Sequence, residues 1–259
     1  MAPHLISITR FAVKGLTGEP LPQAALAAGR GLQDDRRYAL ALAETRIDPE
    51  NPKPLPKTMF VVLMRHARLA ALSSRYDTDS TELQLSTGGR DLGRGRLDSA
   101  AGRAAIEAAI AGFMGEALTG PPRLVEQPGH RFTDVSVVSP EMMEAVSLIN
   151  LASVRAFEAA LGRPVDPRRF RGNLLVDGLE PWAELDWVGR PVRIGGVTFE
   201  GVLRTRRCAA TEVNPDTAER DIRLPAELMR RYGHGDMGIY LSVTGAGTIA
   251  AGDRLTVPA

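Results

Sequence analysis

Alternating apolar and polar positions predict that this chain consists mainly of short β-strands. Three runs in the first half alternate in this way: residues 4–15, 34–44 and 81–87. In the run at 34–44, Tyr38, Leu40 and Leu42 fall on one face. In the second half, β-branched runs separated by glycine pairs cover residues 172–178, 188–208 and 238–257. Short strands at this spacing favour a β-barrel.

A helical period appears in the middle of the chain. Apolar side chains recur there at helical spacing: Ile106, Ile110, Phe113, Met114 and Ala117. Asp98 or Ser99 is placed to cap this helix, and the glycine-rich, basic run at 88–96 predicts a flexible loop before it. We therefore expect an amphipathic helix that rests on a sheet, within a helical insertion at about residues 88–122.

Two further helices are predicted after residue 130. The strand-like run at 144–150 leads to Asn150, which caps a helix that Gly162 closes. One stripe of that helix is apolar: Leu151, Val154, Phe157 and Leu161. A short helix begins at Pro225 and ends at Gly233. The predicted class is α+β, mainly β.

Composition excludes several classes of protein. The chain is 44% hydrophobic with a formal net charge of +1, so no global field favours nucleic acid or an acidic membrane. No apolar stretch approaches the roughly 20 residues of a membrane span, and the start of the chain has no signal-peptide pattern. One cysteine excludes an internal disulfide. These features predict a cytoplasmic protein.

That cysteine, Cys208, follows three arginines in the segment LRTRRCAATEVNPDT. On a strand, Arg204 and Arg206 would share its face and Arg207 would lie opposite. Neighbouring guanidinium groups favour a thiolate, which suits a soft metal or a persulfide. The alternative is an inert, buried thiol that only fills space.

Five segments follow one another in the second half: RFRGNLLVDG, EPWAELDWVGRPVRIGG, RRCAATEVNPDT, GDMGIYLSV and GTIAAGDRL. In this order they resemble the motifs of the MOSC domain, named after the C-terminal part of molybdenum cofactor sulfurase. In the first half, ITRFAVKG and GLQDDRRYALA resemble the domain that precedes MOSC in the mitochondrial amidoxime-reducing component and its bacterial relatives. The resemblance covers roughly residues 1–86 and 130–257. It implies a smaller β-barrel-like domain at 1–130, which carries the helical insertion at about 88–122, and a MOSC β-barrel at 131–259. It implies a molybdenum cofactor at the domain junction, although a barrel can keep this scaffold and bind no cofactor.

The resemblance also implies which residues would hold that cofactor. Cys208 would ligate molybdenum or carry sulfur. The remaining candidates divide into phosphate or pterin contacts (Lys14, Arg36, Arg171, with Arg206 and Arg207 beside the thiol) and pterin hydrogen bonds (Asn150, Ser153, Asn173). Two positions depart from the pattern of the amidoxime reductases: Arg206 stands where they have serine, and Gly15 stands where they often have serine.

Three functions remain open from the sequence. The first is a molybdenum-cofactor-dependent reductase of small N-hydroxylated or N-oxide substrates, which would need a separate electron-donor protein because one cysteine cannot hold an iron–sulfur cluster. The second is a sulfur carrier that receives a persulfide on Cys208 from a cysteine desulfurase. The third is a protein that binds or stores the cofactor without turnover.

Other polar residues are weaker candidates. We expect Glu184 and Asp186 to be structural, because no nucleophile lies near them in the sequence. His234 and Asp236 lie on a predicted loop, where His234 is a candidate for proton delivery. The four histidines show no metal-ligand spacing.

Overall fold

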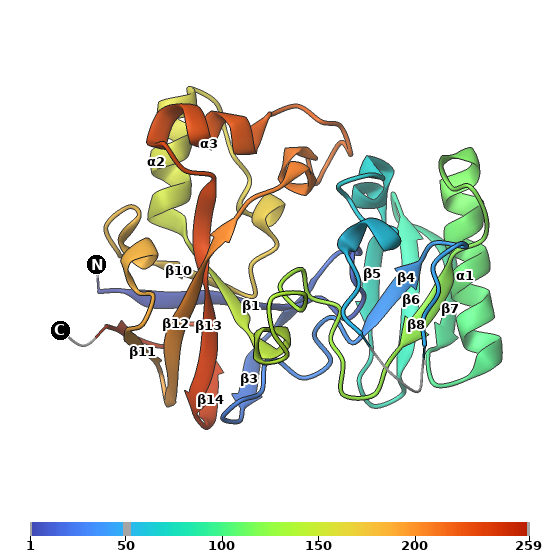
Figure 1. Cartoon of the computed structure of the whole chain (residues 1–259), viewed down its shortest axis with the longest axis horizontal. Coiled ribbons are helices and arrows are strands. Elements are labelled where there is room, and N and C mark those ends of the chain that lie inside the picture. Colours follow the sequence, from blue (N-terminus) through green and yellow to red (C-terminus); the bar gives the residue numbers. More distant parts are fainter. Residues whose placement is uncertain (1, 49–52, 258–259) are drawn as a thin grey trace.

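The computed structural model describes residues 2–48 and 53–257 and consists of two lobes side by side (Figure 1). We call them the barrel lobe (β1–β3, β9–β15, α2 and α3) and the small lobe (β4–β8 and α1). Each lobe has its own apolar cluster, centred on Phe199 and Leu241 in the barrel lobe and on Tyr38 and Ile106 in the small lobe. The predicted α+β class, mainly β, is confirmed.

The barrel lobe is built on one eight-stranded sheet with the order β15-β11-β12-β13-β9-β10-β1-β2. Its strands are β1 (His4–Arg10), β2 (Glu19–Leu21), β9 (Val146–Asn150), β10 (Leu174–Asp177), β11 (Pro191–Ile194), β12 (Val197–Arg206), β13 (Asp236–Gly245) and β15 (Leu255–Thr256). A bridge between His4 and Arg254 joins the start of β1 to the segment before β15. The sheet thereby closes on itself, as expected of a barrel.

The first strands of the chain belong to the barrel lobe. β1 pairs antiparallel with β10, and β3 (Gln23–Leu26) pairs with β14 (Gly247–Ala250). The chain then enters the small lobe and returns to the barrel lobe at β9. The predicted boundary at residue 130 lies between β8 and β9, and strands from both sides of it share one sheet.

Two short sheets form the small lobe. β4 (Tyr38–Ala41) pairs with β8 (Arg123–Glu126), and β5 (Ser73–Tyr76), β6 (Glu82–Thr87) and β7 (Arg90–Arg96) form a three-stranded sheet. Tyr38, Leu40 and Leu42 share one core, as predicted from their alternation. The strand predicted at 34–44 is shorter than expected, because Asp34 and Arg36 adopt positive φ angles of 57° and 49° in a turn before β4.

The predicted amphipathic helix is α1 (Ala100–Met114), capped by the Ser99 side chain, which accepts a hydrogen bond from the Gly102 amide. The expected flexible loop at 88–96 is wrong, because β7 occupies most of it. The glycines there serve close packing: a Cβ on Gly95 would lie 2.3 Å from the Gly102 carbonyl oxygen. The apolar side of α1 is one wall of the small lobe's core.

Both helices predicted after residue 130 are present. Asn150 caps α2 (Leu151–Leu161), and its side chain accepts from the Ala152 amide. α3 runs over Leu224–Tyr232. Gly162 and Gly233 end the two helices in the left-handed region.

Candidate functional site

A cavity of about 340 Å³ lies at the junction of the two lobes. We call it the anion cavity, because basic side chains outnumber acidic ones in its walls. Its charged lining residues are Lys14, Arg36, Lys57, Asp134, Arg169, Arg171, Arg204, Arg206 and Arg207. Cys208, Thr133, Thr205 and Tyr240 also line it. The structure therefore brings most of the predicted site residues to one place.

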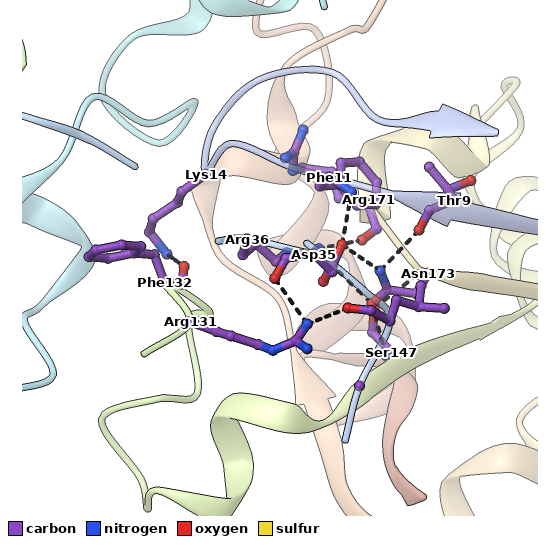
Figure 2. A network of polar contacts seen from close by, with 12 residues as sticks. Thr9, Phe11, Lys14, Asp35, Arg36, Arg131, Phe132, Ser147, Arg171 and Asn173 are labelled. Atoms are coloured by element: carbon purple, nitrogen blue, oxygen red, sulfur yellow. Dashed lines mark hydrogen bonds and ion pairs between the residues drawn. The ribbon is translucent and has the colours of Figure 1, made fainter. Parts of the chain in front are cut away.

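One wall is fixed by a buried polar network around Asp35 (Figure 2). The Asp35 carboxylate accepts from the Phe11 amide at 2.8 Å, from Asn173 Nδ2 at 3.0 Å and from Arg36 Nη1 at 2.5 Å. Arg36 Nη2 donates to the Arg171 carbonyl oxygen at 3.1 Å. The network holds Arg36 and Arg171 beside each other at the cavity.

Asn173 belongs to this network, and both polar groups of its side-chain amide already form hydrogen bonds within it. Its Nδ2 donates to the Thr9 carbonyl oxygen and to Asp35, each at 3.0 Å. Its Oδ1 accepts from the amide and the hydroxyl of Ser147 and from Arg36. The Asn173 side chain thus positions Asp35 and Arg36 at the cavity, and its predicted contact to the pterin stays a prediction. Arg171 ends a 3₁₀ turn with a φ of 51°.

Arg171 presents a cation without a carboxylate partner among the described residues. Its guanidinium lies 4.4 Å from the centre of the Phe11 ring, and Arg36 lies 4.5 Å from the same ring. Burial, aided by the charge of Arg36, lowers the pKa of Arg171 to about 9, so the side chain stays charged at neutral pH. A half-buried cation of this kind is stabilised by an anionic ligand.

A second wall holds two lysines on one carboxylate. Lys14 Nζ donates to Asp134 Oδ1 at 2.5 Å and to the Phe132 carbonyl oxygen at 2.9 Å, and Lys57 Nζ donates to Asp134 Oδ2 at 3.1 Å. Burial opposes ionisation of Asp134, but Lys14 and Lys57 hold its pKa well below the usual range. Burial lowers the pKa of Lys14 despite the attraction of Asp134.

Cys208 lies half-buried at the point where β12 has ended and a 3₁₀ turn (Ala209–Glu212) begins. Its carbonyl oxygen accepts from the Thr211 amide at 3.0 Å and from the Thr211 hydroxyl at 2.9 Å, which fixes the turn. Burial opposes the charge on Lys57, but Asp134 and a hydrogen bond with Cys208 raise the pKa of Lys57. The thiol thus faces a cation from the small lobe.

The predicted faces of the three arginines are corrected. β12 ends at Arg206, so the strand alternation does not extend to Cys208. Arg207 turns inward and donates to the carbonyl oxygens of Met237 and Phe170, and burial lowers its pKa to about 10. Arg204 donates to the Leu185 carbonyl oxygen and to Asp186, and Arg206 is exposed at the rim.

Asn150 and Ser153 do not reach the anion cavity. Asn150 Nδ2 and Ser153 Oγ each donate to Oε2 of the buried Glu184 at 2.9 Å. Their predicted contacts to the pterin are therefore corrected: both side chains hold Glu184, which confirms the structural role expected of that residue. His234 packs on the rings of Trp182 and Tyr232, away from the lining of the anion cavity.

Sequence reasoning missed Lys57, Asp134, Thr205 and Tyr240. Lys57 follows a proline-rich run that partly lies outside the described residues, and the only sequence signal was the rarity of lysine in this chain. The hydroxyls of Thr133 and Thr205 are buried, and neither has a hydrogen-bond partner among the residues that the structure describes. Unpaired hydroxyls, uncompensated cations and a thiol in one cavity fit a polar anionic ligand that also carries a thiophilic atom.

The described residues contain no group of three or more His, Cys, Asp and Glu side chains that could hold a metal ion. In the same part of the chain, the helices are too short or too polar to cross a membrane.

Residues 129–256 match a family described as the MOSC domain. "Mitochondrial amidoxime-reducing component 1" of Xenopus laevis is 27% identical over 144 residues, which cover 51% of this chain and 41% of the relative. "Mitochondrial amidoxime reducing component 2" of Rattus norvegicus is 32% identical over 42% of this chain and 35% of its own length. "Molybdenum cofactor sulfurase" of Drosophila mojavensis is 33% identical over 44% of this chain and 14% of the relative.

Each of these alignments thus spans less than half of the relative. Among solved structures, a YUAD protein from Bacillus subtilis covers 98% of this chain and 94% of its own, at 11% identity and a TM-score of 0.45. YiiM from Geobacillus stearothermophilus covers 44% of this chain and 54% of its own, at 20% identity and a TM-score of 0.35.

Proposed function

Because residues 129–256 of this chain form a MOSC domain, we propose that the protein binds the molybdenum cofactor in the anion cavity and reduces N-hydroxylated or N-oxide compounds. The observation that supports this best is the meeting of one thiol and several cations in the walls of a single cavity. The relatives named amidoxime-reducing components support the choice of reaction.

The residues present fit the cofactor at both of its ends. Arg171, whose guanidinium has no carboxylate partner in the described chain, would bind the terminal phosphate with Lys14. The unpaired hydroxyls of Thr133 and Thr205 would hydrogen-bond the pterin. The Cys208 sulfur would ligate molybdenum, because a thiolate suits a soft metal.

The bound cofactor would supply a metal able to change oxidation state and accept oxygen from the substrate. The chain's own side chains position the reactants. Lys57 interacts electrostatically with Cys208 and would balance negative charge on its sulfur, while Asp134 holds Lys57 in place at 3.1 Å. Since the single cysteine cannot hold an iron–sulfur cluster, we assign the supply of electrons to a separate donor protein.

Metal and pterin analysis of the protein expressed with the cofactor tests this proposal. The wild type should carry molybdenum and pterin in stoichiometric amounts, and Arg171→Met should lose most of both. Arg155→Gln, which breaks an exposed pair with Asp177 outside the anion cavity, is the matched control and should load normally. Cys208→Ala should change the electron paramagnetic resonance signal of molybdenum. A wild type without molybdenum or pterin would contradict the proposal.

A sulfur carrier is the second candidate, favoured by the match to molybdenum cofactor sulfurase and by a thiol that lines a cavity. The same preparation distinguishes the two functions. After incubation with a cysteine desulfurase and cysteine, mass spectrometry would find added sulfur on Cys208 of a carrier. A reductase would show turnover without that modification.

A further inference from the structure

A second cavity, of about 630 Å³, adjoins the anion cavity, and we call it the side groove. Its walls come from both lobes: β1 and the residues after it, the segment at 69–74, and the segment at 210–216. The two cavities share five lining residues, which are Gly15, Leu63, Arg169, Arg171 and Ala210. The side groove therefore meets the anion cavity along a common wall.

Small and apolar side chains form most of the side groove. They include Leu69, Ala70, Ala71, Leu175 and Val213. Two of its hydroxyls are already used, because Thr17 Oγ1 and Ser74 Oγ lie 3.0 Å apart in a hydrogen bond. Its volume lies in the range of about 300–1,000 Å³ that small-molecule sites occupy. The surface is suited to an apolar group larger than a methyl or an ethyl.

Free hydrogen-bond donors concentrate at the shared wall. The Arg171 guanidinium stacks on Phe11 and has no carboxylate partner in the described part of the chain. Arg169 is 5% exposed, and its Nε is buried without a partner, although its terminal nitrogens bind Glu212 and Asp221. Arg168, farther along the lining, is instead paired with Asp216 at 2.8 Å.

The side groove is polar at the shared wall and mostly apolar along the rest of its length. One end of the side groove meets the anion cavity at the shared wall, and the remainder offers apolar contact. We propose that the side groove binds the organic body of the substrate, an aromatic or branched apolar group, whose N–O head passes the shared wall beside Ala210 toward Cys208 in the anion cavity. The inference rests on the proposed function, because it places the non-reacting part of an N-hydroxylated substrate.

Binding of two hydroxamic acids to the cofactor-free protein tests the inference without turnover. Phenylacetohydroxamic acid and acetohydroxamic acid share the N–O head and differ in the phenyl ring. Calorimetry should show at least tenfold tighter binding of the phenyl compound, because burial of a ring contributes that much or more. Equal binding of the two compounds would overturn the proposal.

Filling the side groove should remove this preference. Ala70→Trp places a large ring in the groove, and Ala105→Trp makes the same change on an exposed position of α1. The first variant should bind the two compounds equally and the second should keep the tenfold ratio. Ser73→Trp, at an exposed lining position, replaces Ala70→Trp if that variant does not fold. A preserved ratio in a folded groove variant would contradict the inference.

Turnover by the cofactor-loaded protein separates the two proposals. If the side groove is correct, the ratio of KM values for the two compounds changes at least tenfold in Ala70→Trp. If the cofactor-loaded wild-type protein binds the phenyl compound but reduces neither compound, the proposed function is overturned and the side groove remains supported as a binding site. A loaded protein that reduces both with the same KM ratio in wild type and variant would overturn the groove alone.

Discussion

At the scale of single residues, Glu184 combines complete burial with the absence of a cationic partner in the described chain. Its side chain is 0% exposed, Oε2 accepts two hydrogen bonds and Oε1 has none. Burial raises the pKa of Glu184 above the ordinary value of 4.5. The native state therefore holds a proton that the unfolded state releases, and the free energy of unfolding falls as pH rises from 4.5 through the native pKa.

Glu184→Gln should remove this dependence. Urea unfolding at pH 5 and pH 8 measures it. The variant should gain stability relative to wild type between the two pH values, because glutamine keeps an acceptor for Asn150 and Ser153 and cannot ionise. Glu184→Leu is the control, expected to be about 1–3 kcal/mol less stable than Glu184→Gln at both pH values, since leucine also cannot ionise but leaves two buried donors without an acceptor. An unchanged difference between Glu184→Gln and wild type would show that Glu184 is charged in the native state throughout.

At the scale of elements, α1 and β7 approach each other through glycine. A Cβ on Gly102 would lie 2.1 Å from the Arg96 carbonyl oxygen, whereas a Cβ on Gly112 would meet nothing within 4 Å. Both glycines lie inside α1, where alanine is ordinarily better by roughly 0.5–1 kcal/mol. Gly112→Ala should therefore stabilise the protein by about that amount.

Gly102→Ala should do the opposite. The added methyl group forces the helix away from the strand backbone, and overpacking of this kind costs about 1–3 kcal/mol. Thermal unfolding of the two variants measures whether each substitution raises or lowers the stability of the protein. Stabilisation by Gly102→Ala equal to that of Gly112→Ala would mean that α1 does not rest on β7 as described.

At the scale of the whole molecule, a buried ion pair joins the lobes. Arg10 on β1 contacts Glu19 on β2 at 2.7 Å and donates to the Tyr76 carbonyl oxygen at 3.1 Å. Glu19 Oε2 accepts from the Tyr76 amide at 3.2 Å. Since β2 and β5 are edge strands of their sheets, these side chains replace a continuous strand ladder between the lobes.

Glu19→Gln should leave the Arg10 charge uncompensated and lower the free energy of unfolding by about 2 kcal/mol. Hydrogen exchange should accelerate at the Tyr76 amide and stay unchanged in β13, inside the barrel lobe. Glu227→Gln removes a partially exposed partner of Arg230 and Arg231 on the surface of α3 and should change little. If the Tyr76 amide keeps its protection in Glu19→Gln, the pair does not hold the lobes together.

Local chemistry made much of the fold predictable. Ser99 and Asn150 cap their helices, and Gly162 and Gly233 end theirs, because caps depend on neighbouring residues alone. The strand at 90–96 could not be predicted from its sequence, because its glycines allow a helix to pack closely against it and do not form a turn. The sequence could not show that contact.

For the candidate site, too, some features could be predicted from the sequence and others could not. The sequence by itself identified Cys208, its basic neighbours and the family pattern, because these depend on residue type and order. Only the tertiary structure decided which polar side chains already form hydrogen bonds within the protein. The hydrogen bonds of the Asn173 side chain go to Ser147, Thr9 and Asp35. Those of Asn150 and Ser153 go to Glu184. Lys57 reaches the thiol from the other lobe. The physical reason is that a hydrogen bond requires its partner in space, and these partners lie far apart along the chain.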